Sequence, residues 1–161
     1  MRRQQFAGLL IIVLAVSGLA WAPSAAADEI GGRIVGGMKI EAEIEDAEAM
    51  QMFTAGRWMI HEPAKGATHH FEVILSDPKY GGRIPYAGVT ATFVNLATKA
   101  KFAKRLDAMY GKQLHYGANV SLASGRYRVA VAVGPPALMR EGEALNRWLS
   151  PVKTLFTFTV A

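Results

Sequence analysis

The sequence predicts an all-β protein, an antiparallel β-sandwich of about seven short strands. Two observations support this fold class. Apolar and polar side chains alternate in several short segments, and clusters rich in glycine and proline separate those segments. Helical spacing is rare by comparison. The strands expected on this basis cover residues 38–45, 57–61, 67–76, 84–95, 101–109, 126–133 and 153–161.

The N-terminal third of the predicted domain mixes regular and irregular segments. Residues 28–37 are rich in glycine and are expected to form a leading arm. Residues 38–45 alternate four apolar side chains with one lysine and three glutamates, which predicts a half-buried strand with one acidic face. Residues 46–56 have no clear period and fit a loop or a short helix. Residues 57–61 fit a short strand.

The expected strand at 67–76 sends its side chains to two opposite faces. Phe71 and Val73 share one face, whereas His70 and Glu72 share the other, because side chains two residues apart on a strand point the same way. The long segment at 84–95 that follows is rich in β-forming residues.

The C-terminal part of the chain combines clear strand patterns with segments that fit two kinds of structure. Residues 101–109 fit either a strand or a helix, whereas residues 126–133 alternate clearly and predict a strand. Gly134, Pro135 and Pro136 then interrupt the chain. Residues 137–149 fit a short helix or an ordered loop, and residues 153–161 fit a closing strand.

The first 27 residues have the three-part pattern of a secretory signal peptide. Arg2 and Arg3 precede an apolar run at residues 6–21, and three alanines ending at Ala27 provide a cleavage site. A retained membrane anchor is the alternative, but the apolar run is short for a spanning helix. We therefore expect cleavage after Ala27 and a single domain over residues 28–161.

Composition limits the partners and the compartment. The chain has 18 basic and 13 acidic residues, so removal of two arginines with the signal leaves 16 − 13 = +3. The basic residues are scattered except at 99–105, which a solvated surface explains better than nucleic-acid binding. There is no cysteine, so any metal must bind through nitrogen, oxygen or thioether ligands. Export without disulfides fits a bacterial periplasm.

Two pairs of side chains suggest a metal site. His70 and Glu72 share a strand face, and Met109 lies six residues before His115 in a stretch that also contains Gly111 and Gly117. Two imidazoles, a carboxylate and a thioether would bind a transition metal. The thioether favours copper over calcium or magnesium, because soft sulfur ligands suit copper far better.

Known catalytic motifs are missing from the sequence. No serine lies in a Gly-x-Ser-x-Gly context, and no Gly-x-Gly-x-x-Gly loop follows a strand. His61 is followed four residues later by Lys65, which excludes the helical zinc-protease motif. His69 should point away from His70 and is expected either to be structural or to support a metal ligand from behind. We therefore expect neither an enzyme nor a small-molecule substrate.

At these residues the sequence resembles the periplasmic iron-transport-associated proteins, known as Fe2+ transport proteins. The matching pieces are His70-Phe71-Glu72, Ile84-Pro85-Tyr86, Phe93-Val94-Asn95, Met109, the stretch 115–120, Gly125 to Tyr127, Pro135-Pro136, Arg147-Trp148 and Pro151. The resemblance implies an immunoglobulin-like sandwich, a homodimer, and metal ligands at His70, Glu72, Met109 and His115. It also implies copper binding, iron as cargo, and an inner-membrane iron permease as partner.

The chain departs from the family in one respect. Family members commonly have another histidine after the Pro-Pro segment, and this chain has none beyond His115. Met139 lies in that region as a substitute thioether, and loss of an imidazole should weaken Cu(II) relative to Cu(I). The expected function is a periplasmic metal-binding protein of iron uptake. The alternatives are a copper or iron redox enzyme and a metal-free immunoglobulin-like interaction module.

Overall fold

The computed structural model describes residues 28–161, and the predicted signal peptide lies outside this range. The regular secondary structure of these residues consists almost entirely of β-strands. They are β1 (Asp28–Val35), β2 (Met38–Asp46), β3 (Met50–Thr54), β4 (Arg57–His61), β5 (His69–Ser76), β6 (Val89–Asn95), β7 (Lys101–Tyr110), β8 (Leu114–Val120), β9 (Gly125–Val133) and β10 (Val152–Val160). One 3₁₀ turn, Gly142–Ala144, lies between β9 and β10.

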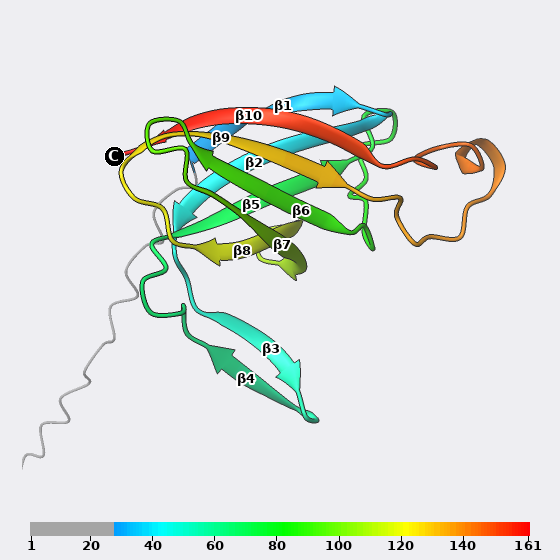
Figure 1. Ribbon diagram of the computed structural model, residues 1–161. Coiled ribbons are helices and arrows are strands. Elements are labelled where there is room, and N and C mark those ends of the chain that lie inside the picture. The colour runs from blue at the N-terminus through cyan, green and yellow to red at the C-terminus, as the bar shows by residue number, and fades with distance from the viewer. Residues whose placement is uncertain (1–27) are drawn as a thin grey trace, which may run out of the picture.

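Eight strands form a single sheet in the order β1-β2-β5-β8-β7-β6-β9-β10, with every neighbouring pair antiparallel. The sheet curls into a nearly closed, barrel-like shape, and β3 and β4 form a separate hairpin that projects from it (Figure 1). The prediction of an all-β, antiparallel fold is confirmed. The narrower assignment to the immunoglobulin-like sandwiches stays a prediction.

The core fills the inside of this curled sheet because alternate residues of each strand point inward. Phe71 on β5 and Phe93 on β6 meet edge to face with their ring centroids 5.0 Å apart, and neither is exposed. On β9 the inward residues begin at Tyr127 and continue through Val133, as the alternation predicted. The two halves of the sheet are therefore held together by aromatic and β-branched contacts across the core.

Three strands were absent from the sequence prediction. Residues 28–35 form β1 rather than an arm, and a register shift between Glu29 and Gly31 accommodates the glycines within it. Residues 50–54 form β3, where a loop or short helix was expected. The third missing strand is β8. The sequence left two possibilities for residues 101–109 and for residues 137–149. Residues 101–109 form a strand, and residues 137–149 form a loop that contains the 3₁₀ turn.

The sheet closes where its first and last strands meet. No backbone ladder joins β1 to β10, although the two lie side by side (Figure 1). Trp148 Nε1 donates a hydrogen bond of 2.9 Å to the carbonyl of Gly37, and the Arg33 guanidinium lies 6.0 Å from the centroid of the Phe156 ring. Side chains therefore cover the seam. Within residues 28–161, no helix is both long and apolar enough to cross a membrane.

Candidate metal centre

The predicted metal ligands lie on the outer face of the sheet, where β5, β8 and β7 are neighbours. Phe71 and the other inward residues of β5 point to the core, so His70 and Glu72 point outward. Cross-strand register places Met109 of β7 directly opposite His115 of β8, on that same outer face. The sheet thus brings together two segments that are more than 30 residues apart in the sequence.

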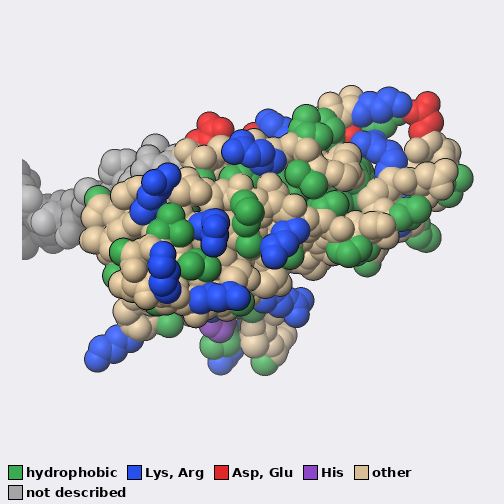
Figure 2. All heavy atoms as spheres, turned by 45° about the horizontal axis from the view of Figure 1, so that its top comes forward, with side chains coloured by type: hydrophobic (Ala, Val, Ile, Leu, Met, Phe, Trp, Pro, Cys, Tyr) green, Lys and Arg blue, Asp and Glu red, His purple; other side chains and the backbone are tan. Residues whose placement is uncertain are grey.

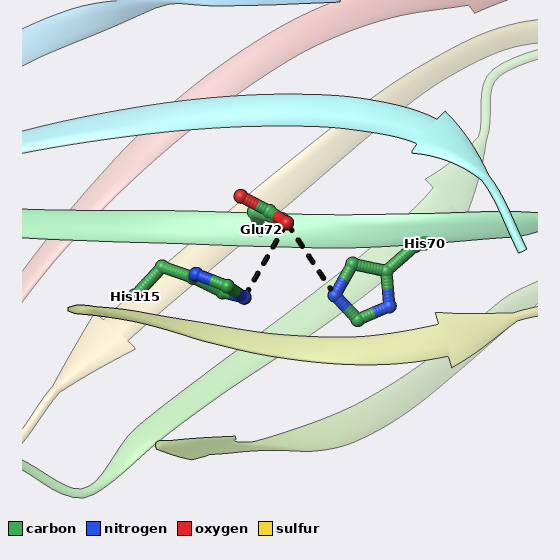
Figure 3. A group of neighbouring side chains, drawn as sticks. All are labelled: His70, Glu72 and His115. Carbon is green, nitrogen blue, oxygen red and sulfur yellow. Dashed lines mark ion pairs between the residues drawn. The ribbon is translucent and has the colours of Figure 1, made fainter. Parts of the chain in front are cut away.

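Three of the four predicted ligands converge closely. Glu72 Oε1 lies 3.6 Å from His70 Nε2 and 3.3 Å from His115 Nε2 (Figure 3). The two imidazole rings are nearly perpendicular, with centroids 6.0 Å apart. His70 is fully buried, and only 5% of His115 and 9% of Glu72 are exposed. This arrangement forms a compact, sheltered cluster of donor atoms.

The other ring nitrogen of each histidine is held by a neighbour. His115 Nδ1 lies 3.1 Å from the carbonyl oxygen of Gln113, which can only accept, so Nδ1 carries the proton. His70 Nδ1 lies 3.0 Å from Asn119 Oδ1. Asn119 Nδ2 donates to the Glu48 carbonyl at 2.7 Å, which orients the amide oxygen toward His70. Both Nε2 atoms therefore present lone pairs to the cluster, and neither has a hydrogen-bond partner.

Gly117 makes room for the two rings. A Cβ atom at this position would lie 2.4 Å from His70 Nε2 and 3.3 Å from His115 Cδ2, well inside contact distance for the first. Any other residue would displace the His70 ring or the backbone of β8. Glycine at this position therefore allows the two rings to approach the backbone of β8 closely.

Glutamate carboxylates surround the cluster, and the sequence analysis did not predict that they would lie there. Burial raises the pKa of Glu72 to about 8, and the nearby carboxylates of Glu45, Glu43 and Glu48 add to the rise. Carboxylate oxygens of Glu45, Glu48 and Glu72 all lie within 4.8 Å of one another. Burial also lowers the pKa of His115, which keeps its imidazole neutral near pH 7.

The two methionines considered as ligands lie in different environments. Met109 is half-buried and lines a cavity of about 720 Å³ together with His115 and residues of the β3–β4 hairpin. Met139 is fully exposed on the loop between β9 and β10 and is not among the residues that line this cavity. Met109 therefore shares a cavity with His115, whereas Met139 does not, and the role of Met109 as the fourth donor stays a prediction.

Asn119, Glu45 and Glu48 are the residues of the centre that sequence reasoning did not identify. The alternation in residues 38–45 correctly predicted an acidic strand face. Glu45 stands opposite His70 only because β2 pairs with β5, and this pairing is not visible in the local pattern. The spacing of His70 and Glu72 could be recognised locally. The positions of Glu45, Glu48 and Asn119 around them could be predicted only from the order of the strands in the sheet.

The donor set fits a transition-metal ion. Two buried imidazole nitrogens lack hydrogen-bond partners on either side of a carboxylate, which is costly in the absence of a bound cation. Each imidazole is also oriented through its Nδ1 atom, as is usual for metal-binding histidines. A carboxylate, two imidazoles and the nearby thioether of Met109 are ligands for copper and for iron.

Charge is distributed unevenly over the molecule. Lys and Arg side chains spread over the face that Figure 2 turns toward the viewer, with few acidic ones among them. Exposed basic residues on the strands β7, β9 and β10 are Lys101, Lys104, Arg105, Arg126, Arg128 and Lys153. The carboxylates of Glu43 and Glu45 on β2, and of Glu48 after it, instead lie near the cluster, where negative charge attracts cations.

The fold and this cluster define an all-β protein with a buried imidazole–carboxylate centre on the outside of a curled sheet. The chain belongs to the Fe2+ transport protein family, whose model matches residues 29–161. The predicted family resemblance is thereby confirmed. No curated protein matches the chain.

Two solved structures illustrate the shared fold. FetP of uropathogenic Escherichia coli, recombinantly expressed in the periplasm, has a TM-score of 0.70 at 23% identity, covering 84% of this chain and 96% of FetP. Copper-reconstituted P19 of Campylobacter jejuni has a TM-score of 0.70 at 22% identity, covering 84% of this chain and 96% of P19. At these identities the likeness concerns the fold alone.

Proposed function

We propose that this protein binds a metal ion in the periplasm and takes part in iron uptake. His70, Glu72, Met109 and His115 hold copper, and iron is the cargo. The observation that carries the proposal is the pair of buried Nε2 atoms that converge on Glu72 without a hydrogen-bond partner. Copper-containing structures of P19 and of a FetP variant support the choice of metal.

In this function the protein holds and presents an ion and does not turn over a substrate. His70 and His115 bind as neutral imidazoles through Nε2, Glu72 binds as a carboxylate, and Met109 adds a soft donor that favours the reduced ion. Because Glu72 keeps its proton below about pH 8 in the metal-free protein, metal binding at neutral pH displaces that proton.

The partners in this proposal are an inner-membrane iron permease and a second copy of the chain. The family description, which names Fe2+ transport, supports the permease. The N-terminal basic and apolar run supports export to the compartment where such a permease takes up its ion. Exposed aromatic side chains on the β3–β4 hairpin, Phe53 and Trp58, support self-association.

The metal centre is tested by titrating the metal-free protein with Cu(II), Cu(I), Fe(II) and Zn(II). We expect tight copper binding that is lost in His115→Ala, because this substitution removes one of two converging imidazoles. Gly117→Ala should also weaken binding, since its methyl group would occupy the position next to His70 Nε2.

His69→Ala is the matched control, because His69 is the neighbour of His70 on β5 and its Nδ1 forms a hydrogen bond only with Thr68 Oγ1, at 2.8 Å. This variant should bind copper like the unmodified protein. If His115→Ala binds copper as tightly as the unmodified protein, the centre is wrong, and the metal-free interaction module becomes the better explanation.

A further inference from the structure

The β3–β4 hairpin carries an unusual concentration of methionine. Three of the seven methionines in the sequence, Met50, Met52 and Met59, lie on its two short strands. The hairpin lies outside the eight-stranded sheet and extends away from it (Figure 1). A two-stranded hairpin has no core of its own, so core packing does not explain these three side chains.

Strand register places all three methionines on one face. Met50 is opposite His61, and Met52 is opposite Met59. Residues that are directly opposite in an antiparallel pair, or two apart along one strand, share a face. Three thioethers and one imidazole are therefore neighbours on the same side of the hairpin, while Gln51, Phe53, Trp58 and Ile60 occupy the other side.

The methionine face is sheltered at Met50 and Met59, which are half-buried, and open at Met52 and His61, which are exposed. On the other face, Phe53, Trp58 and Ile60 are each more than 60% exposed. Thr54 and Arg57 complete the methionine face. None of its side chains is a carboxylate, so the face has no acidic ligand of the kind that calcium or magnesium requires.

The hairpin adjoins the metal centre. Met50 and Met52 line the cavity of about 720 Å³ that Met109 and His115 also line. Gln51, Phe53 and Trp58 of the other hairpin face line it too, whereas Met59 and His61 do not. Two hairpin thioethers thus share a cavity with the thioether and imidazole of the candidate centre.

We propose that Met50, Met52, Met59 and His61 form a second metal site, selective for Cu(I). Cu(I) is a soft ion that accepts few ligands, and thioethers select it over harder ions. Methionine side chains have three rotatable bonds, so sulfur atoms that start on neighbouring Cβ positions about 4.5–5.5 Å apart can turn toward one ion. The site passes Cu(I) across the cavity to the centre, a ligand exchange without change of oxidation state.

The hairpin site does not depend on the proposed function. Only the transfer of Cu(I) from the hairpin to the centre rests on the proposed function.

The test is an anaerobic titration of the full chain with Cu(I), with Ag(I) as a redox-inert probe. NMR of the methionine methyl groups shows which thioethers bind. We expect two Cu(I) ions per chain, with shifts at Met50, Met52 and Met59. A variant with Met50→Leu, Met52→Leu and Met59→Leu should bind one Cu(I) fewer and keep its Cu(II) binding, because leucine preserves the volume but removes sulfur.

Met139→Leu is the control, since Met139 is fully exposed and far from the hairpin in sequence; it should leave the number of bound ions unchanged. His115→Ala should still bind the Cu(I) ion of the hairpin. A result on this variant therefore shows whether the hairpin site exists even if the centre does not bind metal. Unshifted hairpin methyl groups, or an unchanged Cu(I) count in the triple leucine variant, would overturn the proposal and leave the methionine face as a contact surface for another copy. Slower Cu(I) loading of the centre in the triple variant supports transfer, and an unchanged rate removes that step.

Discussion

Among single residues, Glu72 has the ionisation most altered by the fold. Its pKa rises to about 8 through burial and through the neighbouring glutamates, so the folded chain keeps a proton that the unfolded chain releases near pH 4.5. Between these two pH values the native state binds more protons than the unfolded state. Stability of the metal-free protein therefore falls as pH rises through this window.

The corresponding prediction concerns Glu72→Gln in the metal-free protein. Glutamine stays neutral at every pH, so the variant should be more stable than the unmodified protein at about pH 8 and lose most of this advantage at about pH 5. Urea unfolding at both pH values measures the difference. Glu141→Gln, on the loop between β9 and β10, should have no such effect. Equal pH dependence of the Glu72→Gln variant and the unmodified protein would show that the carboxyl group is ionised in the fold.

The residues of the centre differ in how far the sequence could predict them. His70 and Glu72 are two apart on one strand, so local spacing was sufficient to place them on one face. Met109 and His115 were selected for their donor atoms, and their pairing across the short turn between β7 and β8 appears only in the structure. Contact between the pairs depends on β5 lying next to β8. Asn119 was not predicted because its contacts to His70 and to Glu48 cross between elements that are distant in sequence.

At the scale of elements, Tyr116 of β8 fixes the segment that leads into β6. Its hydroxyl donates to the carbonyl of Ile84 and accepts from the backbone N–H of Ala87, each at 2.9 Å. Tyr86 between them has a positive φ of 58°, which is uncommon for a residue with a side chain. The buried hydroxyl thus compensates for the strain of this turn by satisfying two backbone groups.

Tyr116→Phe should therefore destabilise the protein by about 1–3 kcal/mol, because it leaves buried backbone groups without partners. Chemical denaturation measures the loss. Tyr127→Phe is the matched control, since the Tyr127 hydroxyl makes a single hydrogen bond, to the Ala123 carbonyl at 3.1 Å. A smaller loss for Tyr116→Phe than for Tyr127→Phe would contradict this account of the turn.

A buried face made most strands predictable from the sequence, with two exceptions: β8 is largely buried and was missed, and β4 is mostly exposed and was predicted. The strands β2, β9 and β10 alternate because their inner residues fill the core. The β3–β4 hairpin is exposed on both faces over most of its length, so β3 has no apolar period to detect. In β1, Gly31 and Gly32 lower the local propensity for a strand, so the sequence pattern does not reveal it. Pairing with β2 stabilises this strand.

For the whole molecule, the exposed aromatic face of the hairpin predicts self-association. Phe53 and Trp58 pack edge to face with centroids 5.4 Å apart and are each more than 60% exposed. A double variant, Phe53→Ser with Trp58→Ser, should shift the chain from dimer to monomer in sedimentation velocity. Leu155→Ser, an exposed apolar position on β10, is the control. A monomeric unmodified protein at every concentration would exclude the homodimer.

The seam between β1 and β10 affects how readily this protein can polymerise through its strand edges. An outermost strand exposes unpaired backbone groups, which act as a template for strands of other molecules. Here β1 and β10 shield each other, with Trp148 and Arg33 lying across the junction. A chain cut before Met38 would lose β1, and both β2 and β10 would become open to recruitment. Such a chain should polymerise while its remaining strands stay folded, and light scattering together with circular dichroism would reveal ordered assembly rather than collapse.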